Sequence, residues 1–262
     1  LPETRNAQGS RFDFFGFISL SVFITALQLM LDRGQLLDWF SSSEIMIEAI
    51  VAGVAFYLFL VHSFSYEKPF LNPHLFQDRN FVASNIFIFV VGVVLFATLA
   101  LVPPMLQNQM QYPVVLTGLV TAPRGAGTMI AMIVVGRLVT RFDPRLIIAS
   151  GLALTAFSLW QMTQFSLTMN STPIIVSGIL QGFGVGLVWV PLSAVAFTTL
   201  PAHLRNEGTS FFNLLRNVGS SIGISVVMFL LTRNTQTLQA SIAEHVTPYN
   251  AVGNQAAAAA HF

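Results

Sequence analysis

The sequence contains no cysteine and very little charge, and both absences restrict what the protein can be. Without cysteine it can form neither disulfides nor thiolate-ligated metal sites. Only 9% of its 262 residues are charged, whereas about a quarter are charged in an ordinary soluble domain. A net charge of +1 without any cluster of basic residues indicates no nucleic-acid partner. Phosphate-binding loops and hydrolase or metalloprotease motifs are also missing, so no enzyme chemistry is indicated.

Long apolar runs dominate what the sequence does contain. Hydrophobic residues make up 54% of the chain. A helix that spans a bilayer needs about 20 mostly apolar residues, and its backbone groups must be satisfied within the segment. The sequence therefore predicts an all-α integral membrane protein with about seven transmembrane helices. The seven runs cover residues 12–31, 44–64, 81–103, 114–136, 145–163, 173–196 and 208–231.

The basic residues between these runs are distributed unevenly. If residue 1 is cytoplasmic, eight of them lie on the cytoplasmic side, and only Arg33 and Arg233 lie on the other. Basic residues favour the cytoplasmic side of membrane proteins. We therefore expect residue 1 in the cytoplasm and residue 262 outside. The eight residues are Arg5, Arg11, Lys68, Arg79, Arg137, Arg141, Arg145 and Arg205.

Two arginines, Arg124 and Arg216, fall inside predicted spans, and Arg124 lies near mid-membrane. It belongs to the segment Thr-Ala-Pro-Arg-Gly-Ala-Gly at residues 121–127, where Pro123 and two glycines loosen the helix. Within a bilayer an arginine is costly unless it faces a cavity or an acidic partner. Arg124 is therefore a candidate substrate or gating residue in a central cavity. The alternative is that it caps the carbonyls of a broken helix and contacts no ligand.

Two later spans carry polar residues that must face protein or water. In the last span they recur every three or four positions and so share one helix face. In the sixth span, Gln181 stands among glycines spaced for close helix packing. For Arg216, the alternative to a cavity role is that its side chain extends to the nearby interface. The candidates for the substrate cavity are Arg124, Gln181, Asn213, Arg216 and Asn217.

Acidic residues inside a membrane are candidates for carrying protons. Asp32 ends the first span and Glu48 lies about a turn inside the second, so both are possible proton-linked residues. They lie near the interfaces, as does Asp13, and water can solvate them there. His62 stands alone and belongs to no metal-binding pattern. The last five spans contain no carboxylate at mid-membrane, so we do not expect this chain alone to couple to protons.

Four segments in order along the chain resemble one family of transporters. They are LQLMLDRGQLLDWF at residues 27–40, NPHLFQDRNF at 72–81, APRG at 122–125 and GTSFFNLLRNVGSSIG at 208–223. These segments are similar to regions of the fourteen-helix, EmrB-type drug:proton antiporters of the major facilitator superfamily. The resemblance covers nearly the whole chain and implies a partial major facilitator superfamily fold.

The resemblance also implies a division of the chain. Residues 1–64 would hold the family's helices seven and eight, the extra pair between its two bundles, and residues 65–80 a cytoplasmic linker. Residues 81–231 would form five helices of the C-terminal bundle, helices nine to thirteen, and residues 232–262 a periplasmic tail. The N-terminal bundle and helix fourteen would be missing. The odd number of spans and a first residue other than methionine also lead us to expect part of a longer protein.

A cytoplasmic gating loop is implied between the fourth and fifth spans. Thr140 stands where the family usually has an acid, so a strong gating salt bridge is not expected there unless Asp143 replaces that acid. The residues of this loop are Gly136, Arg137, Arg141, Asp143 and Arg145.

The function implied by the resemblance is proton-driven export of amphipathic or aromatic drugs across the bacterial inner membrane. The proton would be the coupling ion, and no other cofactor is expected. Implied partners are small-molecule drugs, the N-terminal bundle of the same protein, a periplasmic membrane-fusion adaptor and an outer-membrane channel. One alternative is a same-fold exporter of a siderophore, metabolite or lipid. Another is a truncated remnant that does not transport, or that serves as an assembly partner.

Overall fold

Every regular element that the structure describes is a helix. The computed structural model describes residues 13–66 and 70–245. Within these ranges seven helical segments are long and apolar enough to cross a membrane, which confirms the predicted all-α membrane architecture. Their elements are α1 (Phe14–Arg33), α2 (Ser43–Ser65), α3 (Arg79–Pro104) with the π-helical turn η3 (Met105–Gln109), α4 (Val114–Thr121), α5 (Pro123–Leu138), α6 (Pro144–Met162), α7 (Thr172–Thr198) and α8 (Arg205–His245). Short 3-10 turns, η1 (Trp39–Ser41), η2 (Pro73–Gln77) and η4 (Ala202–Leu204), precede α2, α3 and α8.

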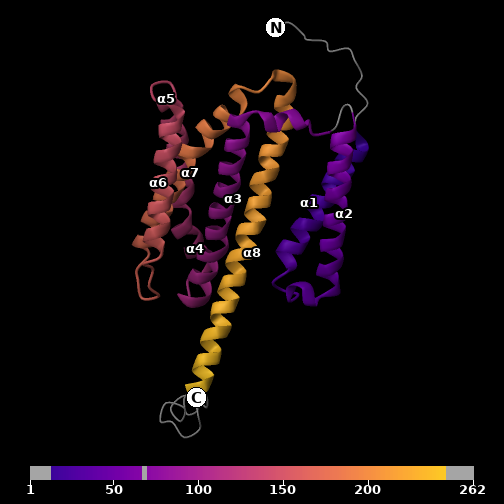
Figure 1. The fold of residues 1–262 in the computed structure, drawn as a ribbon. Helices are drawn as coiled ribbons and strands as arrows, with labels where there is room; N and C mark the ends of the chain where they lie inside the picture. The colour runs from indigo at the N-terminus through magenta and orange to yellow at the C-terminus, as the bar shows by residue number, and fades with distance from the viewer. Residues whose placement is uncertain (1–12, 67–69, 246–262) are drawn as a thin grey trace.

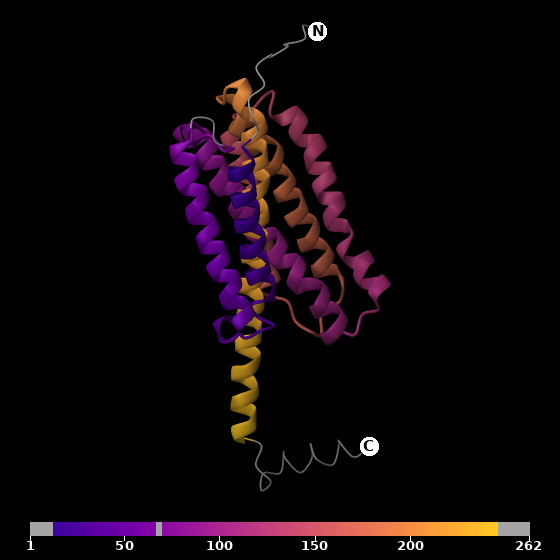
Figure 2. The same ribbon diagram turned by 90° about the vertical axis from the view of Figure 1, so that its right-hand side faces the viewer.

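The helices form two groups. Helices α1 and α2 pack on each other as a hairpin, and this pair meets the rest of the molecule mainly where α1 contacts α8. The remaining helices pack around α7, against which α3, α5 and α6 all lie (Figures 1 and 2). Half of the most apolar stretch of α7 is buried, compared with 17–28% in the other spans. Helix α7 is therefore the centre of the bundle.

Close packing of α5 on α7 depends on glycine. A Cβ atom at Gly182 would lie 2.0 Å from the backbone oxygen of Arg124, and one at Gly186 would lie 2.8 Å from that of Thr128. Only glycine allows backbones to approach so closely. The packing face predicted from the glycine spacing is confirmed at these two positions. Gly178 is less constrained, since its Cβ would meet only the Arg124 Cβ at 3.7 Å.

The fourth predicted span is broken in its middle. Helix α4 ends at Thr121 and α5 begins at Pro123, which has no backbone N–H and so suits the first turn of a helix. Ala122 between them still donates to the Gly118 carbonyl at 2.8 Å. The break places Arg124 in the first turn of α5.

Helix α8 does not end at residue 231, where the last span was predicted to stop. It continues to His245, and its 41 residues correspond to roughly 60 Å at 1.5 Å per residue. Thr232 to His245 includes no glycine or proline to end the helix. The second half of α8 consequently projects well beyond the other helices (Figures 1 and 2). The rest of the predicted tail, residues 246–262, lies outside the described residues.

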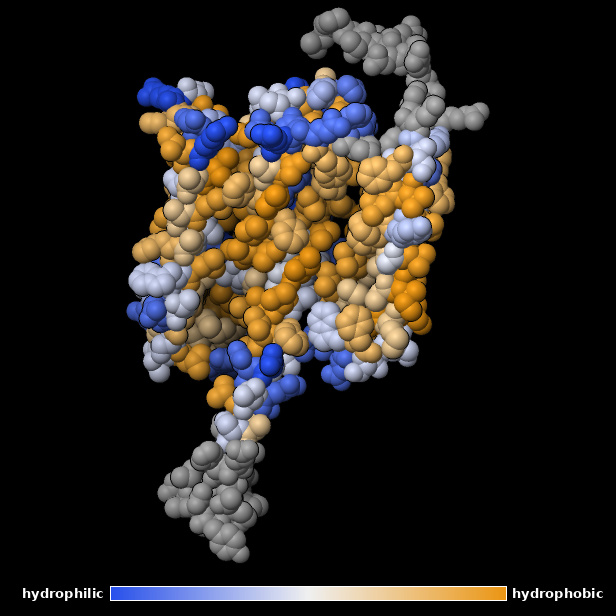
Figure 3. All heavy atoms as spheres, in the orientation of Figure 1, coloured by the Kyte–Doolittle hydropathy of each residue, from blue (hydrophilic) through white to orange (hydrophobic). Residues whose placement is uncertain are grey.

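The molecular surface matches a membrane environment. On the face shown in Figure 3, a broad apolar band covers the bundle, and hydrophilic residues gather at its two ends. Large side chains in this band, such as Val115 and Leu119, are 76% and 66% exposed. Apolar surface on this scale is expected where lipid, not water, is the solvent.

Candidate functional site

A cavity of about 420 Å³ lies between α3, α4, α5 and α7, next to the break in the fourth span. Apolar side chains form most of its wall, including Met162, Phe165 and Ile174. Five polar side chains line it as well: Thr98, Thr121, Arg124, Thr128 and Gln181. We call it the α3–α5–α7 cavity. Its size and its few polar groups among apolar ones are typical of small-molecule sites.

Arg124 reaches from α5 to α3. Its Nη2 donates to the backbone oxygen of Leu95 at 3.3 Å, and the side chain is half-buried. The carbonyl it contacts belongs to a neighbouring helix and not to its own broken one. Arg124 therefore both links two helices and presents a positive charge to the cavity.

Gln181 reaches from α7 to the same turn of α3. Its side chain is fully buried, and its Nε2 donates to the Thr98 hydroxyl at 2.9 Å. That hydroxyl in turn donates to the Val94 carbonyl at 2.5 Å. Because Leu95 is also in this turn, the side chains from α5 and α7 converge on residues 94–98 of α3.

The amide oxygen of Gln181 has no hydrogen-bond partner within the described part of the chain. Its Oε1 is buried and accepts no hydrogen bond from any residue that the structure describes. A buried acceptor without a partner typically costs about 1–3 kcal/mol. Gln181 lines the cavity, but its oxygen is buried, so the side chain must turn before a donor group on a bound molecule can reach it.

The polar face of α8 lies elsewhere. Arg216 places its guanidinium carbon 5.1 Å from the centre of the Trp189 ring on α7. It also donates to the Asn217 side-chain oxygen from Nε at 3.4 Å and Nη2 at 3.3 Å. Asn213 is exposed and bonds the Thr209 carbonyl at 3.0 Å. The structure thus brings Arg124 and Gln181 together but places Asn213, Arg216 and Asn217 outside their cavity.

The two possible proton-linked acids differ in environment. The Glu48 side chain is only 13% exposed, with Oε1 at 3.9 Å from Arg33 Nη1 and no hydrogen-bond partner for Oε2 among the described residues. Arg33 also forms an ion pair with Glu44. Asp32 is exposed. Of the two, Glu48 is the carboxylate held in an apolar setting.

The predicted gating-loop residues lie at the junction of α5 and α6, where all five are exposed. Asp143 is the N-cap of α6, since its Oδ1 accepts from the Arg145 backbone N–H at 2.9 Å. Within the described ranges, no ion pair joins Asp143 to an arginine. Its carboxylate therefore caps a helix here and does not replace the acid missing at Thr140. The four other exposed residues of the predicted gating loop are Gly136, Arg137, Arg141 and Arg145.

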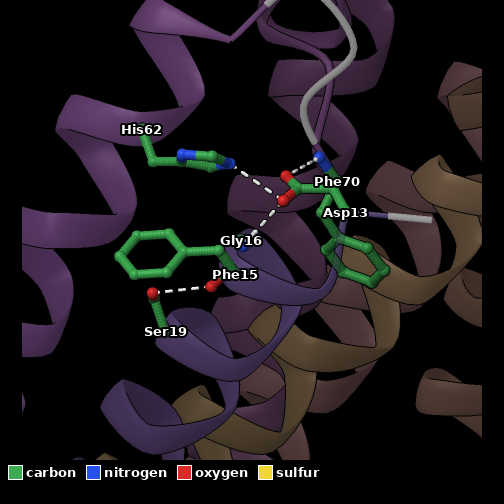
Figure 4. Close-up of polar contacts among 6 residues, drawn as sticks. All are labelled: Asp13, Phe15, Gly16, Ser19, His62 and Phe70. Carbon is green, nitrogen blue, oxygen red and sulfur yellow. Dashed lines mark hydrogen bonds and ion pairs between the residues drawn. The ribbon is translucent and has the colours of Figure 1, made fainter. Parts of the chain in front are cut away.

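Sequence reasoning missed a polar cluster at the base of the α1–α2 hairpin (Figure 4). Asp13 accepts three hydrogen bonds, from Gly16 N at 2.9 Å, from His62 Nε2 at 2.8 Å and from Phe70 N at 2.9 Å. Burial raises the pKa of the Asp13 carboxyl, but these bonds outweigh burial, and its pKa falls below the ordinary value. The sequence contained one signal for this cluster, because an aspartate directly before an apolar run is typical of a helix N-cap. A hairpin then brings the end of α2 beside it.

Known proteins resemble this chain along nearly its whole length. A family model described as Major Facilitator Superfamily matches residues 14–224. The chain is 33% identical over 246 residues to the fatty acid resistance protein FarB of Neisseria gonorrhoeae, which covers 94% of this chain and 48% of the relative. It is 31% identical over 249 residues to the multidrug export protein EmrB of Escherichia coli, covering 95% and 48%. The chain therefore spans about half the length of these curated relatives.

Proposed function

The chain belongs to the Major Facilitator Superfamily of membrane transporters, and from this premise we propose that it forms part of an exporter of amphipathic compounds. The whole exporter includes a second bundle, because transporters of this kind move two bundles around a site near mid-membrane. The α3–α5–α7 cavity is the contribution of this chain to substrate binding. The observation that carries the proposal is the convergence of Arg124 and Gln181 in a mostly apolar cavity.

The cavity fits a molecule with an apolar body and a polar end. Met162, Phe165 and Ile174 would contact the body. The Arg124 guanidinium offers donors and a positive charge, and the free Gln181 oxygen offers an acceptor. A carboxylate on an alkyl or aromatic skeleton matches the Arg124 guanidinium, whereas the Gln181 oxygen needs a separate donor, such as a hydroxyl or amine on the same molecule. The names of the relatives, fatty acid resistance protein and multidrug export protein, agree with such compounds.

We further propose that inward proton movement across the bacterial inner membrane drives export. In this chain Glu48 is the assigned proton-linked carboxylate, because its side chain is nearly buried beside Arg33. The main proton-handling acids would lie in the other bundle. A periplasmic adaptor and an outer-membrane channel would complete the export path.

Replacing Arg124 tests this function. With Arg124→Gln in the full protein, we expect export of an amphipathic carboxylate, such as oleate or a quinolone acid, to fall about tenfold or more. A hydrogen bond to a charged group contributes roughly 1.5–3 kcal/mol, and about 1.4 kcal/mol corresponds to tenfold. The measurement is efflux from proteoliposomes under an imposed proton gradient.

The matched control is Arg233→Gln, which removes an exposed arginine in the second half of α8. The control should export at the wild-type rate. Equal export by the Arg124→Gln and wild-type proteins, at equal protein levels, would show that the cavity is not the substrate site. Export at the same rate without an imposed proton gradient would contradict the proposed proton coupling and leave the assignment of the cavity unaffected.

A further inference from the structure

A second cavity, of about 380 Å³, lies between α1 and α8. Its walls are apolar, with Phe17, Leu20 and Ile24 from α1 and Phe211 and Leu214 from α8. It lies at the same end of the molecule as the turn between α5 and α6, where α8 begins (Figure 1). We call it the α1–α8 groove. The family resemblance assigns no function to it.

Contacts at both ends fix the width of the groove. Far along α8, the Ser225 hydroxyl donates to the backbone oxygen of Leu31 on α1. At the other end, the ring of Phe70 meets Phe17 edge-on, with centroids 5.3 Å apart. Phe70 is itself held by the Asp13 carboxylate. The groove is therefore a built feature of the fold and not a loose gap between two helices.

A carboxylate lines the end of the groove near the start of α8. Glu207 is half-buried and accepts from the backbone N–H of Asn72 at 3.3 Å. Among the described residues no arginine or lysine forms an ion pair with it. A partly desolvated carboxylate is unfavourable without a cation to balance it.

Positive and polar groups stand beside this carboxylate. Asn206 and Ser210 line the same end of the groove. His203 and Arg205 are exposed at the start of α8, and Arg205 directs its Nε to the Leu200 carbonyl at 3.3 Å. Of these two, His203 acts electrostatically on Glu207, whereas Arg205 does not share its helix face. A headgroup with an ammonium next to a phosphate complements the Glu207 carboxylate and the His203 imidazole.

We propose that the α1–α8 groove binds a phospholipid with a primary ammonium headgroup, phosphatidylethanolamine, from the adjacent leaflet. One acyl chain fills the apolar part between α1 and α8. The ammonium group donates hydrogen bonds to Glu207, and the phosphate lies toward His203. A primary ammonium provides three donors, whereas a choline headgroup provides none.

Lipid binding to the purified full protein tests this proposal. Native mass spectrometry would compare phosphatidylethanolamine, phosphatidylcholine and phosphatidylglycerol with identical acyl chains. We expect the wild type to prefer phosphatidylethanolamine about tenfold, and Glu207→Gln to lose that preference while still binding lipid. Asp38→Asn, a carboxylate change on the exposed loop between α1 and α2, is the control and should keep the preference.

A second variant tests the groove without changing charge. Ser210→Leu fills it, so binding of all three lipids at this site should fall together. Equal wild-type affinity for the three lipids, or an unchanged preference in Glu207→Gln, would overturn the proposal. So would displacement of bound lipid by a cationic drug such as tetraphenylphosphonium at equimolar concentration, because the groove would then be a substrate site. If Glu207→Gln fails to fold, the Ser210→Leu result decides.

Discussion

At the scale of single residues, the chemistry of the α3–α5–α7 cavity depends on two side chains that differ in charge and in hydrogen bonding. Arg124 has a described partner, the Leu95 carbonyl, and carries a charge. Gln181 is neutral and fully buried, and half of its amide is unsatisfied. A residue kept only for packing would be expected to satisfy both amide atoms or to be apolar. Under the proposed function, this oxygen is an acceptor that a movement of the side chain would turn toward a ligand.

Gln181→Leu separates these explanations. Leucine has a similar volume, and it removes the unsatisfied oxygen together with the bond to Thr98, whose hydroxyl keeps its bond to Val94. We expect thermal stability to stay within about 1 kcal/mol of wild type, since the lost bond and the removed penalty offset each other. Export should nevertheless fall severalfold. A large loss of stability with normal export per folded molecule would instead assign Gln181 to structure.

At the scale of helices, the α1–α2 hairpin is held at its base by one carboxylate. Asp13 begins α1, meets His62 near the end of α2, and holds Phe70 at the start of the linker. The hydrogen bonds to its ionised form lower its pKa despite the opposing effect of burial. This ionised form contributes stability above the ordinary pKa of 3.8, and the contribution is lost as pH falls through the lower value in the folded protein.

Comparing wild type with Asp13→Asn isolates this charge, because asparagine can still cap a helix. At pH 7 we expect the variant to unfold at a lower temperature, because its free energy of unfolding is about 1–2 kcal/mol smaller. The difference in the free energy of unfolding should shrink below pH 4, because the wild-type carboxyl becomes protonated there and loses its charge. Thermal unfolding in detergent between pH 3 and pH 7 measures both effects. A difference that stays constant across this range would exclude the charge as the cause.

Helix positions were predictable from the sequence, but contacts between helices were not. Runs of about 20 apolar residues identify a span without reference to its neighbours. The length of α8 was not predicted for a related reason: loss of hydrophobicity ends a span, but only a stop signal ends a helix. Arg124 and Gln181 were both candidates, yet their meeting on residues 94–98 depends on how three helices pack. The spacing on α8 grouped Asn213, Arg216 and Asn217 with them although these residues face other surroundings.

At the scale of the whole molecule, orientation in the membrane remains a prediction from the distribution of basic residues. The absence of cysteine makes it easy to test, since each introduced cysteine is the only one in this chain. Leu36 is 83% exposed on the loop between α1 and α2, and Thr140 is exposed at the opposite end, between α5 and α6. A membrane-impermeant maleimide should label Leu36→Cys in intact cells whose outer membrane has been permeabilised.

Thr140→Cys should be labelled only after the inner membrane is also disrupted. The reverse pattern would invert the topology and place the groove carboxylate Glu207 on the outer side. Labelling of both sites in intact cells would mean that the reagent crosses the inner membrane, so a fluorescent or bulky maleimide is the required check.

The unbroken length of α8 has a mechanical consequence. The same helix packs along α3 inside the bundle and projects from it by many residues. Helix α8 has no proline between Arg205 and His245, and its Gly219-Ser220 pair, where a helix can bend, lies against α3 inside the bundle and not in the projecting part. A tilt of the bundle is therefore expected to move the projecting part as one rigid arm. Its tip would sweep a wider arc than the residues around the cavity, so a small rearrangement at the site would produce a larger displacement at the tip.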